Sequence, residues 1–168
     1  KRLSLNPIVE DDFIDEDLNM KDYLKEIINS FMETSNKEFV FNFDQDSNPK
    51  KITKSIEIVY GLRNFIGNAN KFSNKKIFIS LKSDNEITEI TIEDDGDGFS
   101  YDVLSKIGEP YLKSQKISEK SKTGLGLGMF IGKTLLEKNF AKINCRNSKT
   151  RSGAEIIIKW NNKDLFNI

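Results

Sequence analysis

Three glycines at alternating positions, followed by a helix-period apolar run, are the first residues whose type and spacing suggest chemistry. They are Gly124, Gly126 and Gly128, within the stretch 121–133. Glycine destabilises helices and strands, but it allows the backbone to approach a ligand closely. A glycine-rich turn before a helix also gathers unpaired N–H groups at the positive end of the helix dipole. The stretch is therefore compatible with a phosphate-binding turn and, equally, with a flexible surface loop before a core helix.

A row of amide and ammonium side chains is predicted on one face of an earlier helix. Asn64, Asn68 and Lys71 are spaced by four and three residues, so they line up beside the apolar stripe of that helix. Asparagine is a poor helix former, and two on one face need an explanation. A solvated polar face is the simplest one, but such faces are usually rich in Lys and Glu. The row is better suited to a metal ion and a phosphate group. The apolar stripe consists of Ile58, Leu62, Phe65, Ala69 and Phe72.

An acidic residue ends the second strand of a predicted hairpin. Ile90, Ile92 and Asp94 alternate, so the carboxylate continues an inward-facing apolar pattern. A carboxylate there costs free energy unless it is hydrogen-bonded. A polar loop is one interpretation of residues 94–98, but an EF-hand calcium loop is disfavoured because no glutamate is placed to close it. We expect the carboxylate to accept from the exocyclic amine of a flat heterocycle, with the two following glycines leaving room for the ring.

Composition excludes several classes of protein. The 168 residues suit one domain, and 37% hydrophobic with 31% charged residues is typical of a soluble globular chain. Lys+Arg and Asp+Glu both number 26, which argues against non-specific nucleic-acid binding. No signal peptide or membrane-crossing run is predicted. The single cysteine, Cys145, fits a reducing compartment and a small buried apolar role. The chain has no histidine, so no histidine base, metal ligand or phosphohistidine is available within it.

The periodicities predict alternating helices and strands. Residues 1–17 are interpreted as a linker or extension and 18–168 as the domain, with a lysine-rich lid at 113–122. In the last predicted helix, Leu127, Ile131 and Leu135 share a face. The predicted helices are 18–35, 53–72, 100–107 and 127–138, and the predicted strands are 39–43, 76–82, 87–94, 141–146 and 154–160.

Four of these segments together resemble the ATP-binding motifs of the GHKL ATPases, in the histidine-kinase branch. The row that starts at Asn64 resembles the N box, and Asp94-x-Gly96-x-Gly98 resembles the G1 box. The glycine stretch resembles the G2 box, with Met129 replacing the usual leucine, and residues 152–155 resemble the closing glycine block. Each motif is moderately specific, whereas four in the right order are strongly specific. The resemblance covers about residues 18–161, and within this range the amino-acid sequence is most similar to that of RegB/PrrB-type sensor kinases.

The resemblance implies a fold and a set of roles. The fold is an α+β, two-layer sandwich of the Bergerat type, with a mixed sheet and helices on one face. Asn64, Asn68 and Lys71 would be the catalytic residues, of which the two asparagines would hold Mg²⁺. The nucleotide, ATP or ADP, would be bound by Asn68, Lys71, Phe72, Asp94, Gly96, Gly98, Lys122, Gly124, Leu125, Gly126, Leu127 and Gly128.

The resemblance also implies a kinase whose acceptor histidine lies elsewhere. The expected partners are the histidine-bearing dimerisation domain of the parent kinase and a response regulator, with no nucleic acid and no membrane contact by this domain. The expected location is the cytoplasm, with inner-membrane anchoring of the parent protein left open. The alternatives are a GHKL ATPase module, a serine-protein kinase of the same superfamily, and an interaction domain that has lost its nucleotide.

Overall fold

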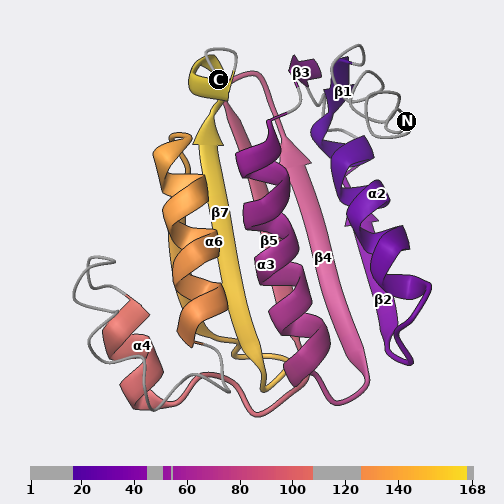
Figure 1. The fold of residues 1–168 in the computed structure, drawn as a ribbon, viewed down its shortest axis with the longest axis vertical. Coiled ribbons are helices and arrows are strands. Elements are labelled where there is room, and N and C mark those ends of the chain that lie inside the picture. The colour runs from indigo at the N-terminus through magenta and orange to yellow at the C-terminus, as the bar shows by residue number, and fades with distance from the viewer. Residues whose placement is uncertain (1–16, 45–50, 54, 108–125, 166–168) are drawn as a thin grey trace, which may run out of the picture.

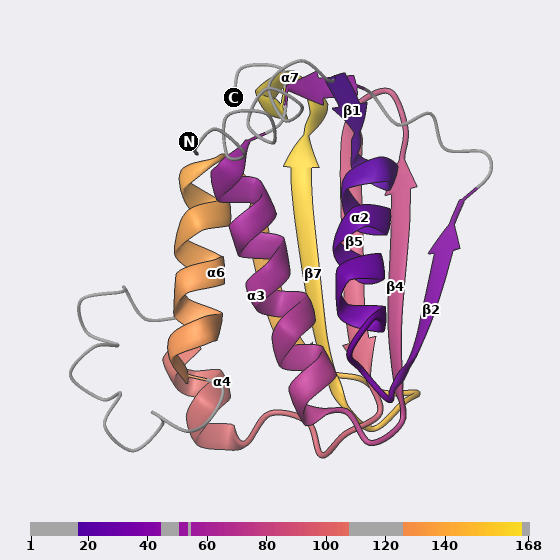
Figure 2. The same cartoon turned by 45° about the vertical axis from the view of Figure 1, so that its right-hand side comes forward.

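The computed structural model describes residues 17–44, 51–53, 55–107 and 126–165, which are built around a five-stranded mixed sheet. The strand order is β2-β4-β5-β7-β6, in which β2 and β4 are parallel and all other neighbours are antiparallel. Helices α2, α3 and α6 cover one face of the sheet (Figure 1, Figure 2). The predicted two-layer α+β fold is therefore confirmed. The elements of this core are α2 (Met20–Met32), β2 (Glu38–Phe43), α3 (Ile56–Phe72), β4 (Lys76–Ser83), β5 (Ile87–Asp94), α6 (Gly126–Lys138), β6 (Lys142–Asn147) and β7 (Ala154–Asn161).

The inner face of the sheet follows from strict alternation of apolar residues. Ile77 lies opposite Asp94, and Ile79 lies opposite Ile92, so the end of β5 points its carboxylate toward the helices. Trp160 of β7 is fully buried, and its indole N–H donates to the carbonyl of Asn139 at 3.1 Å. The inward direction predicted for Asp94 is thus confirmed.

Helix α3 forms the crossover between the parallel strands β2 and β4. It begins at Ile56 because Ser55 caps it, with the serine hydroxyl accepting the N–H of Ile58 at 3.4 Å. The predicted apolar stripe is buried except at Phe72, which is half-buried. At the other end, the ammonium of Lys37 donates to the carbonyls of Asn70 and Ser73 at 2.8 and 2.7 Å. A cation at this position stabilises the C-terminal end of the helix.

Three short elements, β1, β3 and α7, are absent from the predicted helices and strands. Strands β1 (Asp17–Asn19) and β3 (Lys51–Thr53) pair with each other, so the predicted start of the second helix at residue 53 is wrong. Helix α7 (Asn162–Leu165) follows β7, and α4 (Tyr101–Ile107) occupies the predicted short helix. Runs of three or four residues are too short for a periodic signal. The proposed lid at 113–122 lies outside the described residues.

The buried face of α6 differs from the predicted one. Ile131 and Leu135 are only half-buried, whereas Met129, Gly132 and Leu136 face the core. The reason is the close contact with α3, which selects a face rich in glycine rather than the most apolar face. On β6, Cys145 is half-buried, and burial raises the pKa of its thiol to about 12. No helix among the described residues has the length and apolar character needed to cross a membrane.

Glycines bring α3 and α6 into contact. A Cβ at Gly61 of α3 would lie 2.6 Å from Cγ of Leu136 and 3.3 Å from the carbonyl oxygen of Gly132. A Cβ at Gly132 would lie 3.2 Å from the carbonyl oxygen of Gly61. The glycines therefore let the backbone of each helix approach the other, with the side chain of Leu136 packed directly against Gly61.

Replacing Gly61 by alanine should destabilise the protein, by a net ~1 kcal/mol. Overpacking typically costs about 1–3 kcal/mol, which exceeds the about 1 kcal/mol that alanine gains over glycine within a helix. Gly67→Ala in the same helix is the matched control, because its Cβ would meet Phe31 at an ordinary 3.4 Å. Urea unfolding should therefore show Gly61→Ala less stable and Gly67→Ala more stable than the parent protein. Equal stabilisation by both changes would contradict the close contact.

Candidate functional site

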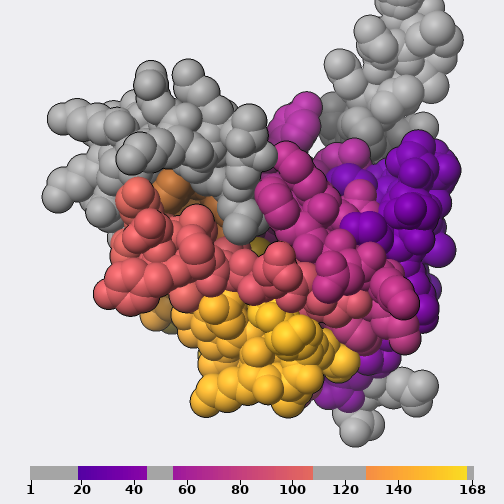
Figure 3. All heavy atoms as spheres, turned by 90° about the horizontal axis from the view of Figure 1, so that it is seen from below, coloured from indigo at the N-terminus to yellow at the C-terminus, as the bar shows by residue number. Residues whose placement is uncertain are grey.

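One end of the sheet carries a small pocket of about 70 Å³ between the helices and the strands. Four segments that are far apart in sequence form it: the end of α3, the end of β5 with the loop after it, the start of α6, and the start of β7. Figure 3 shows this end, where the segment after β5 lies between the C-terminal part of α3 and the turn that joins β6 to β7. The lining residues are Asn68, Ala69, Phe72, Ile92, Asp94, Asp97, Gly98, Phe99, Met129, Ala154 and Ile156.

Asp94 is the buried charge of this pocket. It is 5% exposed, and its Oδ1 atom accepts the N–H groups of Gly96 at 2.9 Å and Ala154 at 3.3 Å. Its Oδ2 atom accepts no hydrogen bond from the described residues. Burial raises the pKa of Asp94, and the two N–H donors oppose the rise without cancelling it. The carboxylate is thus anchored through one oxygen, which leaves the other oxygen available to a donor in the pocket.

The glycines around Asp94 are required by backbone contacts. A Cβ at Gly96 would lie 2.1 Å from the carbonyl oxygen of Phe72, and a Cβ at Gly153 would lie 2.0 Å from that of Asp94. Gly98 has a φ of 81°, which non-glycine residues rarely adopt. Of the two G1 glycines, Gly98 lines the pocket, whereas Gly96 lets the loop contact the end of α3.

Two residues of the predicted polar row on α3, Asn64 and Asn68, lie next to α6, where they face Gly132 and Gly128. The Nδ2 atom of Asn68 is enclosed and has no hydrogen-bond partner among the described residues. Gly128 faces it, since a Cβ there would lie 3.2 Å from that atom. One turn earlier, the Nδ2 atom of Asn64 donates to the carbonyl of Tyr60 at 2.8 Å. A buried unpaired amide donor costs free energy, which an acceptor on a bound ligand would recover.

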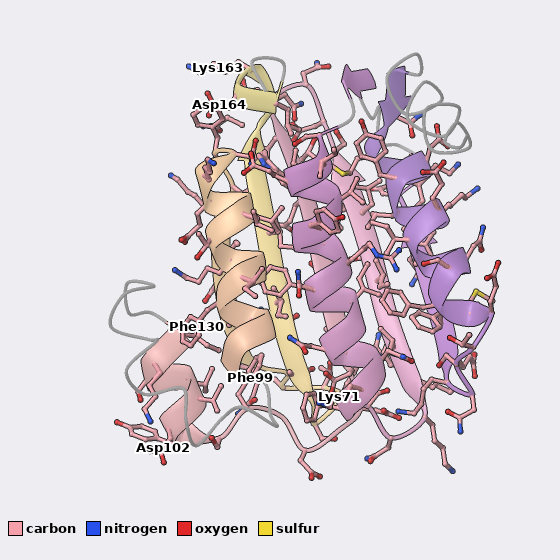
Figure 4. All side chains as sticks on the ribbon, in the orientation of Figure 1. Lys71, Phe99, Asp102, Phe130, Lys163 and Asp164 are labelled. Atoms are coloured by element: carbon pink, nitrogen blue, oxygen red, sulfur yellow. The ribbon has the colours of Figure 1, made fainter. Side chains whose placement is uncertain are left out.

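Lys71 lies at the last turn of α3, at the same end of the molecule as Phe99 (Figure 4). Its side chain is exposed, with Nζ 5.2 Å from the ring centre of Phe72. Gly126 and Leu127 are the first residues of α6. The remaining predicted nucleotide ligands lie outside the described residues, namely Lys122, Gly124 and Leu125.

Sequence reasoning missed two groups that shape the pocket. Phe99 and Met129 form apolar walls and are 5% and 1% exposed. Asp95 joins the ends of β4 and β5, because its carboxylate accepts the N–H groups of Asn74, Lys75 and Lys76. Burial alone would raise the pKa of Asp95, but these N–H donors outweigh it and lower the pKa. Two consecutive aspartates, Asp94 and Asp95, precede Gly96 in the sequence, and this pair was the available signal that a second carboxylate has a structural role.

The comparisons with known proteins agree with this geometry. Residues 53–164 match the family model described as histidine kinase-, DNA gyrase B- and HSP90-like ATPase. The sensor histidine kinase RegB of Cereibacter sphaeroides is 32% identical over 108 residues, which cover 61% of this chain and 23% of RegB. The chain thus spans about a quarter of the length of that relative. The similarity to RegB agrees with the resemblance to RegB/PrrB-type sensor kinases drawn from the sequence.

Solved structures share the fold at lower identity. The catalytic domain of histidine kinase ThkA superposes with a TM-score of 0.69 at 21% identity, covering 86% of this chain and 93% of ThkA. Full-length ShkA, solved in complex with AMPPNP, gives a TM-score of 0.66 at 18% identity, covering 86% of this chain and 30% of ShkA. Because the family model matches most of the chain, this protein belongs to the family of histidine kinase-, DNA gyrase B- and HSP90-like ATPases.

Proposed function

We propose that this chain is the ATP-binding catalytic domain of a two-component sensor histidine kinase. The observation that carries the proposal is the pairing of two groups in one pocket. The buried carboxylate of Asp94 has an oxygen, and the amide of Asn68 has a buried donor, that find no partner within the part of the chain that the structure describes. An adenine amine suits the first, and a phosphate oxygen suits the second. The similarity to RegB and the nucleotide analogue bound by ShkA support the same conclusion.

The adenine side of the site is proposed to centre on Asp94. Its free Oδ2 atom would accept the exocyclic amine, while Phe72, Phe99 and Met129 offer apolar surface to the ring. Gly96 and Gly98 would act by fixing the course of the loop beside the ring. Apolar walls with a single convergent polar group are typical of small-molecule sites.

The phosphate side is proposed to follow α3 toward α6. Asn68 and Asn64 offer amide oxygens to a magnesium ion, and Lys71 offers an ammonium group to phosphate. The described residues contain no group of three or more His, Cys, Asp or Glu that could hold a metal ion. This donor set fits Mg²⁺ bound by few protein ligands together with phosphate oxygens. The bound ion would neutralise charge on the phosphates. Gly124, Gly126 and Gly128 are proposed to let the backbone lie close to the phosphates.

The phosphoryl acceptor is proposed to lie outside this chain, because the chain contains no histidine. A histidine on the dimerisation domain of the parent kinase is the proposed acceptor, a response regulator is the proposed onward partner, and the cytoplasm is the proposed location. A GHKL ATPase is the alternative, but Asn64 disfavours it. An asparagine amide cannot take a proton from water at neutral pH, so it cannot act as a general base. A serine-protein kinase of this superfamily would use the same nucleotide site.

Replacing Asp94 by asparagine should weaken ADP binding by roughly 30- to 150-fold, or about 2–3 kcal/mol. The variant either loses a charge-assisted acceptor or directs an NH₂ group at the adenine amine. Calorimetry with Mg·ADP measures the effect. Asp102→Asn removes the same charge from the exposed surface of α4 and should bind as the parent protein does. A loss below threefold in Asp94→Asn would refute the adenine assignment.

Nucleotide affinity should fall as the pH is lowered toward the pKa of Asp94. Burial holds this pKa above its ordinary 3.8, and the protonated group cannot serve as an anionic acceptor. The contribution of Asp94 to the folding stability of the free protein should change in the opposite direction, and should increase as the pH is lowered. A raised folded-state pKa contributes stability that is present at low pH and lost as the pH rises through it. The ratio of ADP affinities between parent and Asp94→Asn isolates this group, and a ratio that does not change with pH would contradict the prediction.

The isolated chain should hydrolyse Mg·ATP more slowly than about 0.1–1 per second, the low end of ordinary enzyme rates. General-base assistance is typically worth about 10²–10⁴-fold, and Asn64 cannot supply it. Steady-state phosphate release measures the rate. Asn64→Glu should raise it, whereas Asn64→Gln, which keeps an amide, should not. Turnover above that range in the parent protein would favour the ATPase alternative.

A further inference from the structure

The side chain of Asn147, the last residue of β6, is hydrogen-bonded to the main chain of the pocket loop. Its Oδ1 atom accepts the N–H of Phe99 at 2.6 Å, and its Nδ2 atom donates to the carbonyl of Phe99 at 3.0 Å. One amide group thus satisfies both backbone groups of a single residue, as a neighbouring strand would. The two residues are 48 positions apart in sequence, and none of the predicted motifs includes Asn147.

The contact controls the conformation of two residues that line the pocket. Phe99 is 5% exposed and forms a wall of the pocket. Gly98, one residue earlier, is held at its φ of 81°, and a Cβ on it would lie 2.7 Å from Oδ1 of Asn147. The amide therefore sets the direction in which the chain leaves Asp94 and turns toward α4.

The turn that follows Asn147 is fixed to β5. The hydroxyl of Ser148 donates to Oε2 of Glu93 at 2.8 Å, and Nε of Arg151 lies 3.7 Å from Oε1 of the same carboxylate. The guanidinium of Arg151 also stacks on Phe78 at 3.7 Å from its ring centre. These contacts hold the backbone next to Asn147 in place, although Asn147 itself is solvent-exposed.

We propose that Asn147 is a positioning residue of the nucleotide pocket, which acts on adenine through the backbone of Gly98 and Phe99. This inference rests on the proposed function, because it assigns the ligand of the pocket as a nucleotide. Only a side chain with an adjacent donor and acceptor can pair with both groups of Phe99 at once. Removing it leaves an N–H and a carbonyl to find other partners, and the loop is then free to leave the conformation that borders Asp94.

The test measures ADP and AMP affinity by calorimetry, and hydrogen exchange of the Phe99 amide by NMR, for the parent chain and three variants. Asn147→Leu removes both hydrogen bonds at nearly constant volume, and Asn147→Asp keeps only the acceptor. Asn162→Leu is the matched control, because Asn162 also donates from Nδ2 to a backbone carbonyl, that of Asp84 at 2.7 Å, and accepts at Oδ1, but at the opposite end of the sheet.

We expect Asn147→Leu to lose about tenfold in affinity, equally for ADP and AMP, and to speed exchange at Phe99, consistent with the loss of two hydrogen bonds. Asn147→Asp should retain protection of the Phe99 N–H but lose part of the affinity, and it serves as the test variant if the leucine variant fails to fold. Asn162→Leu should lower stability and leave affinity unchanged.

Binding by Asn147→Leu within twofold of the parent protein would overturn the inference. An equal affinity loss in Asn162→Leu would also overturn it, because the loss would then result from lower protein stability. A loss of affinity for ADP but not for AMP would overturn it as well, because the affected contacts would then lie at the phosphates. Failure of the parent chain to bind ADP would instead refute the proposed function and the inference with it, and the exchange rate at Phe99 would still report whether the contact exists.

Discussion

The burial of the Asp94 carboxylate is the constraint on which the rest of the site depends. An ionised carboxylate removed from water must be compensated, and the N–H groups of Gly96 and Ala154 supply that compensation from two different strand ends. Each donor requires a backbone to approach closely, which is why Gly96 and Gly153 cannot carry a Cβ. The ends of β5, β7 and α3 are thereby fixed relative to one another around a single charge. The pocket is the space that this arrangement leaves.

A second constraint sets the helices above the pocket. Helix α6 meets α3 through Gly61 and Gly132, and the same close approach encloses the amide of Asn68 opposite Gly128. The lack of a partner for this donor among the residues in the described ranges is therefore a consequence of helix packing rather than of local sequence. Interiors tolerate few such groups, and those that persist are usually explained by function or by an unseen partner. A nucleotide phosphate is the partner that we propose.

The proposed chemistry is consistent with what these residues can and cannot do. A kinase must hold the terminal phosphoryl group of ATP in place and keep it from water until its acceptor arrives. The row on α3 offers amides and an ammonium group, which can position phosphates but cannot abstract a proton. In the proposed complex, the pocket would supply shape on the adenine side and hydrogen-bonding capacity on the phosphate side. The proposed reactive step would then depend on a histidine that this chain does not contain.

The sequence by itself determined the order of the main elements, the inward direction of Asp94 and the shared face of Asn64 and Asn68, because strand and helix periods encode them locally. It also carried the motifs that identify the family. Only the tertiary structure decided which face of α6 is buried and that Asn147 pairs with Phe99 across 48 positions. Apolar periodicity ranks side chains by hydrophobicity, whereas glycine contacts depend on how closely two backbones approach. A side chain that pairs with a distant backbone leaves no periodic trace, so the fold had to bring the two together before the contact could be recognised.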